Sequence, residues 1–165
     1  MLFRSLLLAR LDAQTPAPVE APHDARIETR ETLAALQAQA QLRQQTLVLV
    51  AEQPVYLSMP AGHMGVLLRN LVDNALRYSP EGARIEVRWH AQPPCLEVHD
   101  SGQGLAPEAL AQLGQRFYRV PGTQAEGSGL GWSIVRRLAE LHGVHWQVQN
   151  SPLLGGLMVR LCWPA

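Results

Sequence analysis

Two hydrophobic periodicities alternate along this chain of 165 residues, and their order restricts the fold more than any other feature. Apolar residues at helical spacing predict helices at 29–44, 62–78, 107–114 and 130–142. Alternating or continuous apolar runs predict strands at 46–50, 55–59, 84–90, 95–99, 144–150 and 157–162. This order predicts an α+β fold, a two-layer sandwich with helices on one face of a mixed, mostly antiparallel sheet of about five strands.

The composition is that of one folded domain whose acidic and basic residues are equal in number. Hydrophobic residues make up 47% of the chain, which is long enough to bury a core. The formal net charge is zero, so the composition does not indicate a surface for nucleic acid or anionic lipid. All 14 basic residues are arginines. Phosphate groups would therefore be contacted by guanidinium groups or backbone amides.

The two cysteines lie in strand-like runs and show neither a CxxC motif nor the spacing of a metal site. We expect Cys95 and Cys162 to be two small buried hydrophobic residues, which fits a reducing compartment.

The first ten residues are apolar but are interrupted by Arg4 and Arg10. They are too short to span a bilayer, which takes about 20 apolar residues, and they lack the apolar stretch of a signal peptide. We interpret them as the end of a helix that packs on something absent from this chain. Three prolines between residues 16 and 22 then predict an extended linker.

A polar stripe accompanies the apolar stripe of the helix expected at 62–78. Asn70, Asn74 and Arg77 are spaced four and three residues apart, so they share one side of that helix. Two amides and a cation suit phosphate oxygens, and an amide oxygen can ligate Mg²⁺ without adding charge. The alternative is an ordinary solvated helix face.

An acidic residue ends the strand expected at 95–99. Asp100 has the same strand parity as Leu96 and Val98, so its carboxylate is expected to point into the protein and to need a partner. Gly102 and Gly104 follow and allow the backbone to turn tightly against a ligand. The alternative is a simple Asx turn.

Residues 115–129 form a long loop, and loops of this length in compact domains are often functional. Arg116 and Arg119 flank two aromatic residues in it, as phosphate contacts or as surface charges beside a hydrophobic anchor. Gly127, Gly129 and Gly131 then precede a helix, where backbone amides can bind phosphate. This pattern matches neither a P-loop nor a Rossmann fingerprint.

Together and in this order, the four clusters resemble the N, G1, F and G2 boxes of the ATP-binding catalytic domains of bacterial sensor histidine kinases. These domains belong to the ATPase superfamily shared with gyrase, the Hsp90 chaperones and MutL, whose fold is the Bergerat ATP-binding fold. Residues 69–80, 116–119 and 127–131 are especially similar to the quorum-sensing (QseC-type) kinases. Residues 7–12 resemble the last turn of that family's dimerisation helix.

The resemblance implies a role for each box at the phosphate end of the nucleotide. Asn74, helped by Asn70, would hold Mg²⁺, and Arg77 would meet the phosphates. Arg119 would join Asn74 and Arg77 in the catalytic work. The mobile lid over the triphosphate would be formed by Arg116, Arg119, Gly127, Gly129, Leu130 and Gly131.

At the base end, the resemblance implies that Tyr78 lies along the adenine and that Asp100 accepts a hydrogen bond from the adenine amino group. Gly102 and Gly104 would shape the base pocket. Two residues depart from the family pattern. Trp132 is bulkier than the usual aliphatic residue and is expected to perturb the lid hinge, whereas Gln103 is expected to be benign.

The histidine box of the family is missing. The nearest match begins at His23, but Ile27 and Glu28 stand where the motif has threonine and proline, and prolines precede it. We therefore do not expect His23 to accept phosphate. His99 is expected to lie on the opposite strand face from Asp100, at the surface.

These observations predict two parts, with the end of a dimerisation helix and a linker at 1–25 and the catalytic domain at 26–165. The domain is expected to bind ATP and Mg²⁺ and to transfer the γ-phosphoryl group to a histidine of a separate dimerisation domain, with a response regulator as a further partner. It is expected to be cytoplasmic, to bind no nucleic acid and to meet a membrane only through missing upstream segments. The alternatives are a truncated or regulatory non-catalytic module that binds a nucleotide or only a partner, and a serine kinase of the anti-sigma-factor type.

Overall fold

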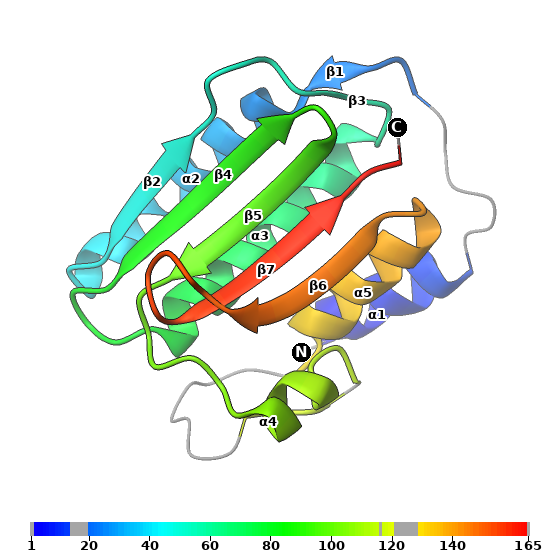
Figure 1. Ribbon diagram of the computed structural model, residues 1–165. Helices are drawn as coiled ribbons and strands as arrows, with labels where there is room; N and C mark the ends of the chain where they lie inside the picture. The colour runs from blue at the N-terminus through cyan, green and yellow to red at the C-terminus, as the bar shows by residue number, and fades with distance from the viewer. Residues whose placement is uncertain (1, 14–19, 116, 121–128, 165) are drawn as a thin grey trace.

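The computed structural model describes residues 2–13, 20–115, 117–120 and 129–164. One five-stranded sheet forms its centre, in the order β2-β4-β5-β7-β6 (Figure 1). The strands β2 and β4 pair in parallel, and the other neighbours are antiparallel. The five strands are β2 Thr46–Val50, β4 Arg84–Ala91, β5 Pro94–Asp100, β6 His145–Asn150 and β7 Leu157–Cys162.

Helices cover one face of this sheet and leave the other face open (Figure 1). The core contains buried residues of α1, α2, α3 and α5 together with the sheet, and α4 lies beyond the end of the sheet. A small second sheet pairs β1 with β3. The remaining elements are α1 Leu2–Asp12, β1 His23–Asp24, α2 Ala25–Leu42, β3 Tyr56–Leu57, α3 Ala61–Tyr78, α4 Pro107–Gln112 and α5 Gly131–Leu141.

The predicted two-layer sandwich with a five-stranded mixed sheet is confirmed. The helix α2 begins at Ala25, earlier than expected, because the Asp24 carboxylate caps it by accepting a hydrogen bond from the Arg26 amide. The strand expected at 55–59 is reduced to β3, which lies outside the main sheet.

The helix α3 carries the polar stripe singled out in the sequence, so its placement fixes the site. Its apolar side, with Met64, Leu67 and Leu71, is fully buried under the sheet. The helix ends at Tyr78 because the following Ser79 is extended and precedes a proline. The end of α3 therefore reaches the edge of the core next to the end of β5.

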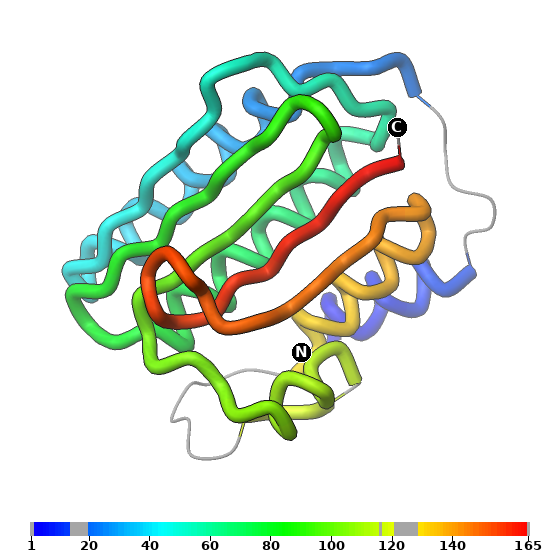
Figure 2. Tube along the Cα trace, viewed as in Figure 1, coloured from blue at the N-terminus to red at the C-terminus, as the bar shows by residue number. Residues whose placement is uncertain are grey.

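The N-terminal segment is confirmed as a helix, α1. The expectation that it packs on something absent from this chain is wrong for one side of the helix, which packs on α5. Figure 2 shows α1 running beside α5, and Leu8 and Leu11 are buried there. Asp12 forms an ion pair with Arg137 of α5 at 3.2 Å. The other side of α1, with Leu2, Phe3 and Leu6, is exposed. In the described part of the chain, no helix is long and apolar enough to cross a membrane.

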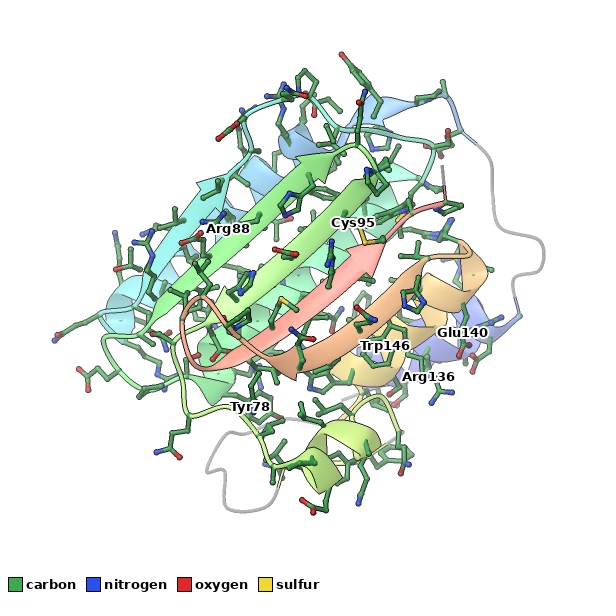
Figure 3. The ribbon with its side chains drawn as sticks, viewed as in Figure 1. Tyr78, Arg88, Cys95, Arg136, Glu140 and Trp146 are labelled. Atoms are coloured by element: carbon green, nitrogen blue, oxygen red, sulfur yellow. A yellow bond between two sulfur atoms is a disulfide. The ribbon has the colours of Figure 1, made fainter. Side chains whose placement is uncertain are left out.

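The cysteines are not two separate thiols as expected. Cys95 of β5 and Cys162 of β7 are directly opposite in the sheet register and form a disulfide. Figure 3 shows Cys95 on the open face of the sheet. The sequence interpretation failed because partners 67 residues apart meet only through the strand order.

His99 is another correction. Its strand parity was interpreted correctly, but it is 3% exposed rather than a surface residue. Ser151, just after β6, covers it, with the hydroxyl oxygen 2.8 Å from His99 Nδ1. On the other side, Glu97 lies 3.1 Å from His99 Nε2. A side chain on the open face is thus buried by its polar neighbours.

Candidate functional site

A cavity of about 450 Å³ lies between the end of α3 and the strands β5 and β7. Its walls combine apolar residues of α3, β5 and β7 with a few polar side chains, which is the usual composition of a small-molecule pocket. Figure 3 marks Tyr78 at this end of the molecule. The polar lining includes Arg43, Asn74, Arg77, Asp100 and Gln103, and the apolar lining includes Leu71, Ala75, Val98, Trp132, Leu157 and Val159.

The carboxylate of Asp100 lies in this cavity and is 6% exposed, so the predicted inward orientation is confirmed. Its Oδ1 accepts hydrogen bonds from the amides of Gly102, at 2.9 Å, and Leu157, at 3.1 Å. Burial raises the pKa of Asp100, and the two amide bonds oppose that rise. The result is a buried acceptor held in a fixed orientation.

The turn after Asp100 is fixed by residues that sequence reasoning missed. The Asn150 side chain accepts a hydrogen bond from the Leu105 amide at 2.8 Å and donates one to the Leu105 carbonyl at 3.0 Å. Gly104 has a φ of +71°, and a Cβ there would lie 2.5 Å from Asn150 Oδ1. This turn therefore requires glycine at position 104, and the role of Gly104 in a base pocket stays a prediction.

Gly156 was also missed, although a Cβ added there would approach Asp100 more closely than a Cβ added at either predicted glycine. A Cβ at Gly156 would lie 2.0 Å from Asp100 Oδ1 and 2.4 Å from the Asp100 carbonyl. Its amide donates to that carbonyl at 3.0 Å. The available signal was the pair Gly155-Gly156 between two strands, which by itself indicates only a turn.

Two amides of α3 meet the first residue of α5. A Cβ at Gly131 would lie 3.0 Å from Asn74 Oδ1 and 3.4 Å from Asn70 Oδ1, so the three residues are adjacent. Both asparagines are buried, and Asn70 Nδ2 donates to the Val66 carbonyl at 2.8 Å. Within the described residues, Asn70 Oδ1 and Asn74 Nδ2 have no hydrogen-bond partner. Buried amide atoms of this kind are typical of a site that is completed by a ligand.

The side-chain oxygens of Asn70 and Asn74 can bind Mg²⁺ only together with oxygens that a bound ligand supplies. Among the described residues, no group of three or more His, Cys, Asp or Glu side chains could hold a metal ion. Mg²⁺ is usually bound through one or two protein groups plus the phosphates of a substrate. The amides of Asn70 and Asn74 therefore suit a metal that arrives with phosphate.

Arg77 lies at the last turn of α3 and lines the cavity. Its Nε is 3.0 Å from Oδ2 of Asp73, one turn earlier. Burial alone would raise the pKa of Asp73, but the hydrogen bond from Gln39 and two guanidinium groups outweigh it and lower that pKa. Asp73, which holds Arg77 beside the cavity, was assigned no role from the sequence.

The end of α3 is held in place by two side chains from the α2–β2 connection. Arg43 Nη2 donates to the Ser79 carbonyl at 2.7 Å. Gln45 Nε2 donates to the Leu76 carbonyl at 2.9 Å and to the Pro80 carbonyl at 3.0 Å. These bonds satisfy carbonyls that a helix end leaves unpaired, and they fix Tyr78 at the rim of the cavity.

The structure places the predicted lid residues only in part. Arg116 and Gly127 lie outside the described residues. Arg119 is exposed and does not line the cavity. Leu130 is buried. Gly129 has a φ of +69°, and a Cβ there would lie 2.9 Å from the backbone of Phe117. Trp132 is buried in the cavity wall, and its effect on a lid hinge stays a prediction.

Residues 61–165 match the sequence model of the family described as histidine kinase-, DNA gyrase B-, and HSP90-like ATPase. The chain is 47% identical over 111 residues to the sensor protein QseC of Escherichia coli (strain K12), an alignment that covers 67% of this chain and 22% of QseC. The chain therefore spans about a fifth of the length of that relative.

Solved structures share the fold. A mycobacterial sensor histidine kinase, MprB, superposes with a TM-score of 0.76 at 24% identity, covering 87% of this chain and 99% of that one. The full-length kinase ShkA, solved in complex with AMPPNP, superposes with a TM-score of 0.77 at 24% identity over 98% of this chain and 35% of its own. The two-layer fold predicted from the sequence is thus shared with MprB and with part of ShkA.

Proposed function

This chain belongs to the histidine kinase-, DNA gyrase B-, and HSP90-like ATPase family, and we propose that it binds Mg·ATP and transfers the γ-phosphoryl group to a histidine on a dimerisation domain. The observation that carries the proposal is the cavity with a buried acceptor, Asp100, at one end and the cluster of Asn70, Asn74 and Gly131 beside the other. The AMPPNP complex of ShkA, which shares the fold, supports a nucleotide as the ligand.

The base end of the cavity suits adenine. Asp100 is a charged acceptor in a largely dry site, and adenine offers an amino donor at its six position. The apolar walls formed by Leu71, Val98 and Val159 match the faces of a purine. Tyr78 would lie along the ring, and Gly102 with Gly104 would keep the pocket open.

The other end suits phosphates and Mg²⁺. Asn70 and Asn74 would hold the metal through amide oxygens, and Arg77 would contact phosphate oxygens. Bound Mg²⁺ neutralises charge that develops on the transferring phosphoryl group. The protein's share of the work is to position the nucleotide and to exclude water. The lid residues Arg116, Arg119, Gly127, Gly129 and Leu130 would close over the triphosphate.

The phosphate acceptor is proposed to lie on another domain. The nearest motif match, His23, belongs to the short strand β1, and its Nε2 lies 3.4 Å from Glu28. The division at residue 25 into linker and catalytic domain, the response regulator as partner and the cytoplasmic location remain proposals of the same kind. All of them rest on the family.

A phosphotransfer assay tests this function. With γ-labelled Mg·ATP, the chain alone should carry no acid-labile label, because the family's histidine box is missing from it. Adding a dimerisation hairpin from a related sensor kinase should produce label on the hairpin. Label at His23, found by mass spectrometry, would refute the separate acceptor. ATP binding without label on any hairpin would favour the alternative, a regulatory nucleotide-binding module.

A further inference from the structure

One buried carboxylate joins three helices beside the proposed phosphate site. Asp73 of α3 accepts a hydrogen bond from Gln39 of α2, with Nε2 at 2.9 Å from Oδ1. Its Oδ2 lies 3.1 Å from Arg4 Nη2 of α1 and 3.0 Å from Arg77 Nε. The Asp73 side chain is 8% exposed. The N-terminal helix is therefore one side chain away from the arginine proposed to contact phosphate.

The two arginines compete for the same oxygen. Gln39 occupies Oδ1, and both guanidinium groups reach Oδ2. Two guanidinium groups bound to one oxygen repel each other, and the buried position of the carboxylate reduces screening of this repulsion by solvent. The attraction of Arg77 to Asp73 is therefore weaker while Arg4 is in place, and the attraction of Arg4 is weaker while Arg77 keeps its full charge.

We propose that Asp73 is a positioning residue that couples the docking of α1 to the contact of Arg77 with the nucleotide phosphates. The inference rests on the proposed function, since it needs a phosphate at Arg77. A bound phosphate offsets the charge of Arg77, so Arg4 binds Oδ2 more strongly and α1 docks more firmly. By thermodynamic reciprocity, docked α1 must favour phosphate binding by the same factor.

Arg4 is the suitable residue to change, because α1 has other attachments. Leu8 and Leu11 are buried, and Asp12 pairs with Arg137 of α5. Loss of the Arg4 contact therefore alters the charge at Asp73 without detaching the helix. Arg10, exposed on the same helix, provides a matched control with the same loss of charge.

The experiment measures Mg·ATP and adenosine binding by calorimetry for the wild-type chain and three variants. Arg4→Gln should weaken Mg·ATP binding about twofold to fivefold, the range of a partly exposed ion pair. Arg4→Lys should restore most of the loss, and Arg10→Gln should have no effect. Adenosine has no phosphate, so its affinity should be the same in all four proteins.

A second readout follows from reciprocity. Mg·ATP should slow amide hydrogen exchange in residues 2–12 of the wild-type chain, and this protection should be lost in Arg4→Gln. Wild-type affinity for Mg·ATP in Arg4→Gln would overturn the coupling. Equal weakening of adenosine and Mg·ATP would also overturn it, because that result indicates a structural defect. A wild-type chain that binds no Mg·ATP would refute the proposed function, and this inference with it.

Discussion

At the scale of single residues, we propose that base recognition depends on Asp100. Its carboxylate is buried at the end of β5, and the amides of Gly102 and Leu157 both donate to Oδ1. Gly156 packs so close that a side chain there would overlap Asp100. The position and orientation of the acceptor are therefore fixed before any ligand binds, which favours selection among bases.

Replacing Asp100 by asparagine should reduce the preference for ATP over GTP. Guanine has a carbonyl oxygen where adenine has its amino group, so two acceptors would face each other in the wild-type pocket. An unpaired buried acceptor costs about 1–3 kcal/mol, which corresponds to roughly fivefold to 150-fold preference for ATP. The asparagine amide can donate to guanine instead, so ATP binding weakens and the preference narrows.

Competition binding of ATP and GTP to the parent and to Asp100→Asn measures this preference. Glu108→Gln is the matched control, since Glu108 is an exposed carboxylate of α4 outside the cavity lining. Circular dichroism shows whether the variant is folded. A folded variant that keeps the full preference for ATP would exclude Asp100 from base recognition.

The sequence was sufficient to predict the inward direction of Asp100, but not the residues that hold the turn after it in place. Strand parity with Leu96 and Val98 predicts the inward direction, because alternation is a local property of a strand. Asn150 and Gly156 contact this turn from about 50 residues further along the chain, by way of the β6–β7 connection. No local pattern specifies such a contact.

At the scale of elements, the helices α3 and α5 form one unit. Their site ends meet through Asn70, Asn74 and Gly131. At the opposite ends, His63 Nδ1 lies 2.8 Å from His142 Nε2. One imidazole must donate and the other accept, so this contact requires at least one neutral ring. Burial lowers the pKa of His142 to about 4, helped by the charge of His63, and burial also lowers the pKa of His63.

Acidification should therefore loosen this pair of helices. A histidine whose pKa is lowered by folding stabilises the folded state above its unfolded pKa of about 6.5, and this contribution is lost as the pH falls toward 4. We expect a loss of about 1 kcal/mol, after allowance for the partial exposure of both rings. The melting temperature should fall over this range, and His142→Gln should make the fall smaller. An equal fall in both proteins would contradict the assignment.

The elements themselves were predictable because periodicity is strong in them. The helix α3 begins at Ala61 against an expected 62, and β2 has the expected bounds. Which strands pair with one another was harder to predict from the sequence. The disulfide of Cys95 and Cys162 depends on β7 lying next to β5 with these residues opposite one another. Strand order and register arise from long-range packing, which the spacing of two cysteines does not contain.

At the scale of the whole molecule, the layers were predictable and the attachment of the N-terminal helix was not. The alternation of helices and strands predicts helices on one face of a mixed sheet. The position of α1 depends on the burial of Leu8 and Leu11 and on the ion pair of Asp12 with Arg137. These contacts join segments that are far apart in the sequence. This attachment connects the N-terminal helix to the proposed nucleotide site through Arg4 and Asp73.

The most direct test of the account is whether ATP binding depends on Mg²⁺ through Asn74. Calorimetry with the wild-type chain should give binding at least about tenfold tighter with Mg²⁺ than with EDTA, a difference of about 1.4 kcal/mol. Asn74→Ala should abolish that difference, and Gln147→Ala, at an exposed amide of β6, should keep it. Equal affinity of the wild-type chain for ATP with Mg²⁺ and with EDTA would contradict the proposed metal site.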